Sequence, residues 1–228
     1  MKKKSLFFLA AILMAGSFSG IAQDSKGVWS AGADFFNRYN WRGSDYGNSP
    51  VVQPTVKYAC GGFSVGAWGS YSLSAITVLS DSVHSNSTEA DLFIGYTFKN
   101  GFSLLMTDYY FPAEPGSNGN YFDYNNSHVF EISAAQSIGK FSLSGNYYFA
   151  NANDDIYFEA GYAFNPVNVF LGAGNKSYSS NGEFNVVNLG ISSTKTIGIT
   201  DKFSLPLTGK VIINPDKEQI FLVIGFTL

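Results

Sequence analysis

The chain has 228 residues, of which 45% are hydrophobic, 17% are aromatic and only 14% are charged. This composition excludes an intrinsically disordered protein, because such chains have few aromatic residues and a high net charge. A formal charge of −3 and a pI near 5.3 argue against a nucleic-acid partner, since phosphate attracts basic surfaces. A mean hydropathy of +0.02 argues against a bundle of membrane-spanning helices.

The first segment has the pattern of a secretory signal peptide. Three lysines at 2–4 precede an apolar run over 6–14 and a small-residue cleavage site that ends at Ala22. We therefore predict a cleaved signal peptide over 1–22 and one mature domain over 23–228. The alternative, a retained anchor, is disfavoured because the apolar run is shorter than the roughly 20 residues that a spanning helix needs.

The rest of the chain shows an alternation of apolar residues with smaller or polar ones. Leu92, Ile94 and Tyr96, for example, share one face of a strand, and Phe93 and Gly95 share the other. This period of two predicts β-strands with one apolar face. Twelve segments carry the pattern, at about 28–40, 51–60, 63–73, 88–98, 102–111, 127–138, 141–150, 155–164, 167–175, 184–199, 203–213 and 219–228.

Short and long connections alternate between these segments. The short ones contain turn-forming Gly, Asn, Pro and Asp, at 61–62, 99–101, 139–140, 165–166 and 200–202. The others are mostly longer and polar, around 41–50, 74–87, 112–126, 151–154, 176–183 and 214–218. Short periplasmic turns, longer external loops and an even strand number are typical of outer-membrane barrels. We predict an all-β fold, a single antiparallel up-and-down transmembrane barrel of about twelve strands, with both termini periplasmic.

The main rival fold is a soluble β-sandwich or lipocalin-like barrel. Twelve strands exceed the roughly eight of a small barrel whose interior is filled by side chains. The smaller face is mostly Gly, Ser, Thr and Asn, which suits a wet lumen. The last strand, 219–228, ends in Phe226-Thr227-Leu228 and resembles the aromatic-ended strand that the outer-membrane assembly machinery recognises. These features favour the bacterial outer membrane, with membrane lipid and the assembly machinery as partners.

Aromatic residues gather at the ends of the predicted strands, which predicts a girdle at each membrane interface. The outward face between the girdles is nearly free of charge, as expected where Arg or Lys costs up to about 2–4 kcal/mol. The predicted girdle residues include Trp29, Tyr39, Trp41, Tyr71, Tyr109, Tyr110, Phe141, Phe164 and Phe203.

Charged residues with the opposite parity are predicted to face the lumen. They are Asp34, Arg38, Lys57, Glu89, Asp91, Glu131, Glu159 and Lys210. One interpretation is a polar pore with a mild cation preference. The other is an internal network of salt bridges that fills the barrel, because charges in a low-dielectric interior must be paired.

Catalytic and metal-binding patterns are weak. His84 lies in a polar loop and His128 has lipid-side parity, and neither shares a face with an obvious nucleophile. The Asn and Asp residues of 151–155 are typical of a turn more than of a metal site. We expect no enzyme activity, no metal and no cofactor.

Five segments resemble the TorF-type family of outer-membrane porins of Gram-negative bacteria. They are 36–45, 49–54, 61–70, 89–96 and 109–112, and the Arg-Gly at 42–43 and the Gly-Ala-Trp-Gly-Ser at 66–70 are the most specific parts. The resemblance is best over 29–112, implies an outer-membrane barrel, and carries over no ligand-binding residues.

These observations predict a porin for the passive passage of small solutes through a polar lumen. The alternative is a closed structural or adhesive barrel that acts through its external loops at 74–87 and 112–126. A hydrolase at the outer rim, using His84 or His128, is the third and weakest hypothesis.

Overall fold

The computed structural model describes residues 26–73, 88–112 and 119–228. The predicted signal peptide at 1–22, the loop at 74–87 with His84, and part of the loop at 112–126 lie outside the described residues. These assignments therefore stay predictions.

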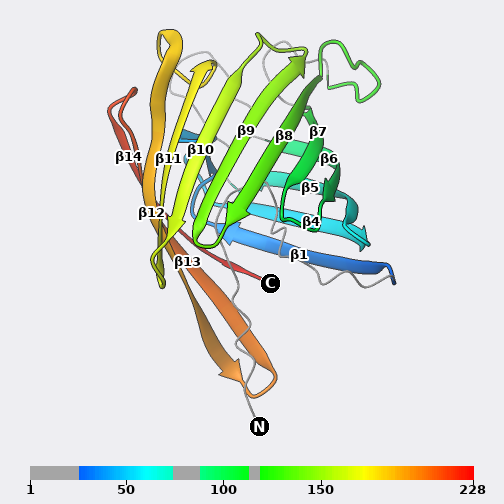
Figure 1. Ribbon diagram of the computed structural model, residues 1–228, viewed down its shortest axis with the longest axis vertical. Coiled ribbons are helices and arrows are strands. Elements are labelled where there is room, and N and C mark those ends of the chain that lie inside the picture. Colours follow the sequence, from blue (N-terminus) through cyan, green and yellow to red (C-terminus); the bar gives the residue numbers. More distant parts are fainter. Residues whose placement is uncertain (1–25, 74–87, 113–118) are drawn as a thin grey trace.

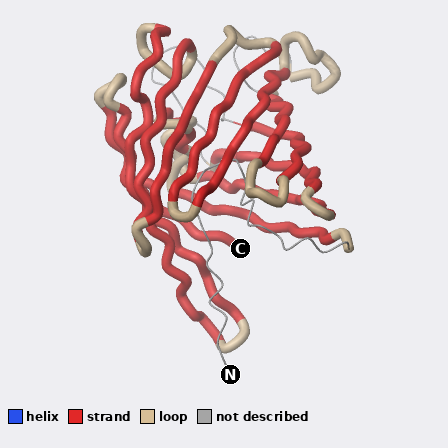
Figure 2. The backbone as a smooth tube through the Cα atoms, viewed as in Figure 1, coloured by secondary structure: helices blue, strands red, loops and turns tan. Residues whose placement is uncertain are grey.

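Fourteen strands make up the regular structure (Figure 1, Figure 2). Twelve of them form one closed antiparallel barrel, and β2 and β3 form a separate two-stranded sheet. The strands are β1 (Val28–Phe36), β2 (Asn40–Trp41), β3 (Ser44–Asp45), β4 (Val51–Cys60), β5 (Phe63–Ser72), β6 (Thr88–Thr97), β7 (Ser103–Tyr110), β8 (His128–Ile138), β9 (Phe141–Ala150), β10 (Ile156–Ala163), β11 (Val167–Lys176), β12 (Gly182–Thr200), β13 (Phe203–Asn214) and β14 (Gln219–Thr227).

Each barrel strand pairs with its neighbours along the chain, and β1 pairs with β14 to close the ring. The predicted all-β, twelve-stranded, up-and-down barrel is confirmed, and most strand limits agree within two residues. One end of the barrel carries the tight turns, such as that at 139–140, and is called the short-turn end below. The other end carries the longer connections and is called the long-loop end.

The first strand differs from its prediction, because β1 ends at Phe36 and not at residue 40. The side chain of Asn37 donates to the carbonyl of Leu222 at 3.1 Å and accepts from the backbone N–H of Ile224 at 2.9 Å. This amide completes the pairing of the strand end with β14. The chain beyond it turns away from the wall, although the alternation of the sequence continues.

The ring closes over a short seam. β1 pairs with β4 through nine residue pairs but with β14 through three, from Asp34 with Thr227 to Phe36 with Gly225. Ala33 and Leu228 extend this seam by two backbone hydrogen bonds. Residues 28–32 of β1 are therefore paired on one side only. The hairpin of β12 and β13 projects beyond the short-turn end of the barrel (Figure 1). There, residues 194–200 of β12 no longer pair with β11, and residues 203–206 of β13 do not pair with β14.

The outward face of the barrel is apolar and exposed. Its exposed side chains include Val65, Leu92, Ile132, Leu143 and Leu222. Buried residues, both aromatic and polar, lie on the inward parity of the strands, so the core of this protein is inside the ring. Within the described residues, no helix has the length and apolar character needed to cross a membrane.

Candidate functional site: a hairpin folded into the barrel

The segment after β1, residues 37–50, is folded back into the barrel at its long-loop end, and we call it the inner hairpin. Its strands β2 and β3 are joined by Arg42 and Gly43, which have φ values of 51° and 80°. Two successive residues with positive φ are characteristic of a type I′ turn between antiparallel strands. The side chains of residues 39–42 are each less than a tenth exposed, so the hairpin occupies the interior.

The tip of the inner hairpin contacts the wall on β12 and β13. The side-chain amide of Asn214 donates to the carbonyl of Gly43 at 3.0 Å, and Asn214 is completely buried. A Cβ atom on Gly43 would lie only 1.9 Å from the carbonyl oxygen of Val187. Glycine is required here, both by the positive φ and by this close approach.

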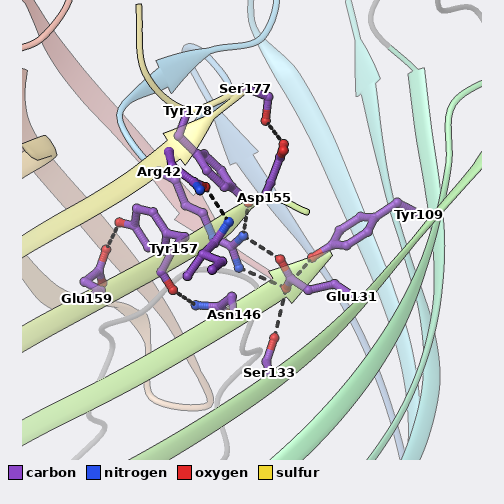
Figure 3. A network of polar contacts seen from close by, with 12 residues as sticks. Arg42, Tyr109, Glu131, Ser133, Asn146, Asp155, Tyr157, Glu159, Ser177 and Tyr178 are labelled. Carbon is purple, nitrogen blue, oxygen red and sulfur yellow. Dashed lines mark hydrogen bonds and ion pairs between the residues drawn. The ribbon is translucent and has the colours of Figure 1, made fainter. Parts of the chain in front are cut away.

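Arg42 joins the inner hairpin to the wall by an ion pair (Figure 3). Its two terminal nitrogens donate to the two oxygens of Glu131 on β8, at 2.6 and 2.9 Å. The carboxylate of Glu131 also accepts from Tyr109 at 3.1 Å and from Ser133 at 2.9 Å. A bidentate pair with further hydrogen bonds is the arrangement that allows two charges to be buried together.

Aromatic rings surround the guanidinium of Arg42. Its central carbon lies 4.2 Å from the ring centre of Trp41, 4.8 Å from that of Tyr157 and 5.5 Å from that of Tyr178, distances typical of cation–π contacts. Burial alone would lower the pKa of Arg42, but Glu131 and the neighbouring tyrosines raise it well above its ordinary value. The hairpin is therefore held by a permanent positive charge.

A second polar cluster lies beside the first, on β10 and β12 (Figure 3). The hydroxyl of Tyr157 donates to Glu159 at 2.5 Å, and the amide of Asn188 donates to both Tyr157 and Glu159 at 2.9 Å. All three side chains are buried. Together with Arg42 and Glu131 they fill the lumen at the long-loop end.

The predicted lumen residues fall into two groups. Glu89, Asp91, Glu131 and Glu159 are buried around the inner hairpin, whereas Asp34, Lys57 and Lys210 are half-exposed. The hydroxyl of Thr227 donates to Asp34, and the ammonium of Lys210 lies 5.2 Å from the ring centre of Phe36.

Arg38, predicted to line the pore from a strand, belongs instead to the inner hairpin. It pairs there with Asp45 at 3.2 Å, because β1 has already ended.

Three residues predicted for the aromatic girdle lie inside the barrel. Tyr39, Trp41 and Tyr109 are 4%, 6% and 3% exposed and form one cluster with Tyr148 and Tyr178. Tyr39 and Trp41 are inside because the inner hairpin carries them there, and Tyr109 has inward parity on β7. Tyr110 is half-buried and stacks on His128. Trp29, Tyr71, Phe141, Phe164 and Phe203 are exposed.

Four residues of the lumen were not predicted from the sequence: Arg42, Tyr157, Tyr178 and Asn188. For Arg42 a signal existed, because an Arg-Gly pair between two short alternating stretches is compatible with a tight hairpin. No such signal existed for Tyr178 or Asn188. Tyr178 contacts Arg42, 136 residues away in the sequence, and Asn188 contacts Tyr157 on another strand.

His128 lies on the outer face of the barrel under the connection 119–127. Its Nδ1 lies 2.7 Å from Asp108, and its Nε2 lies 2.7 Å from the carbonyl of Tyr121. Both ring nitrogens thus face acceptors. These two contacts join the connection 119–127 to β7.

Sequence and structure comparisons place the chain in a family without assigning a function. Residues 22–206 match the family described as "Bacterial protein of unknown function (Gcw_chp)", and the chain belongs to this family. No curated protein matches it. Among solved structures, it is similar to the Salmonella typhi outer membrane phospholipase (OMPLA) dimer with bound calcium, at 10% identity and a TM-score of 0.40, over 86% of this chain and 88% of that chain.

Proposed function

We propose that this member of the Gcw_chp family is an outer-membrane channel for small polar solutes, closed at its long-loop end by the inner hairpin. The observation that carries the proposal is the Arg42–Glu131 pair. It joins a separate two-stranded element to the wall of a barrel that is already complete without it. A closure made in this way can be released without breaking any strand pairing of the ring.

The membrane location is supported by the outward face. Exposed Leu, Ile, Val and Phe side chains follow alternate positions of the strands, and most of the charged residues on the strands have inward parity. Exposing so many apolar side chains to water would cost free energy, whereas contact with lipid would not. The long-loop end would then face outward, the short-turn end would face the periplasm, and β14 would present the strand that the assembly machinery recognises.

Passage through the lumen is supported by three charged residues of inward parity that do not belong to the network of Arg42 and Glu131. Asp34, Lys57 and Lys210 point inward and keep part of their surface accessible. The resemblance of residues 29–112 to TorF-type porins supports the same function. The solute would therefore meet polar, charged walls once the outer closure opens.

Electrical recording tests the proposal. The full chain, refolded and inserted into planar bilayers, should give rare openings as wild type and frequent openings as Arg42→Ala. Arg38→Ala is the matched control, because it removes an arginine from the same hairpin whose partner Asp45 also lies in that hairpin. The absence of discrete conductance in wild type and in Arg42→Ala would overturn the channel.

The second candidate is a closed structural or adhesive barrel, and the filled lumen at the long-loop end favours it. A cluster of aromatic rings and the two polar clusters around Glu131 and Glu159 occupy that region. This candidate predicts that Arg42→Ala lowers stability and leaves the bilayer silent. The same recordings therefore separate the two functions.

A further inference from the structure

Asp91, on β6, carries a buried carboxylate that the inner hairpin network does not use. The residue is 2% exposed, and within the part of the chain described neither carboxylate oxygen has a side-chain hydrogen-bond partner. An isolated buried carboxylate costs several kcal/mol to keep charged, by a rough estimate for ions moved out of water. A buried carboxylate that has this free-energy cost and forms no ion pair within the described residues is a candidate for binding a ligand.

The neighbours of Asp91 on the wall are aromatic. In the register of the sheet it lies directly opposite Trp68 of β5 on one side and Tyr109 of β7 on the other. Residues opposite each other in a sheet share a face, with Cβ atoms roughly 5 Å apart. The carboxylate is thus flanked by two rings in one row across the lumen wall.

The inner hairpin covers this row. The ring of Tyr39 lies 5.8 Å from that of Trp68, and its hydroxyl donates to Glu89, two residues from Asp91 on the same strand face. Burial raises the pKa of Tyr39, and the carboxylates of Glu89 and Asp91 raise it further. Tyr39 is therefore uncharged, and it lies against the carboxylates of Glu89 and Asp91.

The lumen's own cations are engaged elsewhere or lie in other rows. Arg42 is held by Glu131, and Lys57 lies opposite Gly66, in the row of Phe93 and not of Asp91. The described residues contain no group of three His, Cys, Asp or Glu side chains suited to a metal ion. One carboxylate between two aromatic rings instead matches an organic cation, which supplies N–H donors to the oxygens and its charge to the ring faces.

We propose that Asp91, between Trp68 and Tyr109, binds a small organic cation of the primary ammonium or guanidinium class, which is the solute that this channel admits. This rests on the proposed function, because the cation reaches the row when the inner hairpin moves. A carboxylate paired with the bound cation selects against anions, and the rings select against small hydrated metal ions.

The site is tested first by measuring cation binding and only then by recording current in bilayers. The full chain in detergent micelles is titrated with ethylammonium chloride, and separately with sodium and calcium chloride at equal ionic strength, by calorimetry. We expect saturable binding of ethylammonium in wild type or in Arg42→Ala, where the hairpin is released. Asp91→Asn, which keeps the shape of the side chain, should weaken it about ten-fold or more, as expected for a charge-assisted hydrogen bond.

Two further variants make the titration decisive. Asp201→Asn changes an exposed carboxylate in a short turn and should bind ethylammonium as wild type does. Asp91→Glu keeps the charge and should retain part of the affinity. Equal affinity in Asp91→Asn, no binding in either wild type or Arg42→Ala, or sodium or calcium binding as tightly as ethylammonium would each overturn the site.

The failures of the site and of the channel are distinguishable. Ethylammonium binding that depends on Asp91, without current in any variant, would support the site and reject the channel. Current whose cation selectivity and ethylammonium affinity are the same in Asp91→Asn would keep the channel and reject the site.

Discussion

The guanidinium of Arg42 and the carboxylate of Glu131 are 89 residues apart in the sequence and share two hydrogen bonds in the interior of the barrel. Removing one partner leaves the other charged, buried and unpaired. We expect Glu131→Gln and Arg42→Ala each to lower the free energy of unfolding by about 3–5 kcal/mol. Urea unfolding of the chain in micelles measures this change, and Arg38→Ala, whose pair with Asp45 is part-exposed, should cost about 1 kcal/mol or less.

The turn of the inner hairpin offers a steric test. Gly43→Ala places a methyl group against the carbonyl of Val187, whereas Gly182→Ala has almost the same φ, 77° against 80°, and meets no atom within 4 Å. Both variants carry the cost of a left-handed alanine, about 1–2 kcal/mol. Only Gly43→Ala should also displace the hairpin, seen as more frequent openings in bilayers or as cleavage of residues 37–50 by protease. Equal behaviour of the two variants would show that the close approach does not hold the hairpin.

The proposed membrane location is tested by two isoleucines of one strand. Ile132 and Ile138 both point outward from β8 and are 45% and 71% exposed, but Ile132 lies near mid-strand and Ile138 at the short-turn end. In a membrane, arginine should cost about 2–4 kcal/mol at the midplane and about 0–1 kcal/mol near the interface. The free energy of unfolding from lipid vesicles should therefore fall more for Ile132→Arg. Equal losses would contradict a membrane centred on β8.

The loop on the outer face depends on His128. His128→Ala removes contacts to Asp108 and to the carbonyl of Tyr121, so the connection 119–127 should be released. We expect chymotrypsin to cleave it after its aromatic residues several times faster than in wild type. Tyr147→Phe, which removes a hydrogen bond to Asp154 in the neighbouring turn, should leave the cleavage rate at 119–127 unchanged.

The fold was predictable because a barrel imposes its period of two on every strand. Strands such as β6 and β9 alternate in sequence as they do in burial, and their turns contain Gly or Asn where φ is positive. The inner hairpin was not predictable in the same way. Its residues alternate too, so the pattern at 37–41 is the same whether the strand continues or folds inward.

The candidate site could be predicted in part, for a similar reason. Parity identified Glu131, Asp91 and Glu159 as inward, since that depends only on the position within a strand. What each carboxylate contacts depends on the tertiary arrangement, and only Arg42, brought in by the hairpin, decides that Glu131 is paired and Asp91 is not. The girdle positions of Tyr39 and Trp41 were wrong for the same cause.

The seam between β1 and β14 has a consequence for how the molecule is made. The residues that close the ring, Asp34 and Thr227, are 193 positions apart, so their meeting carries the largest loss of chain entropy of any strand pairing. Until it happens, two strand edges carry unpaired N–H and C=O groups, which lipid would not satisfy in the proposed membrane and which other chains can pair with. Every copy therefore passes through a state whose two open edges need shielding, and aggregation at this stage competes with completion of the ring.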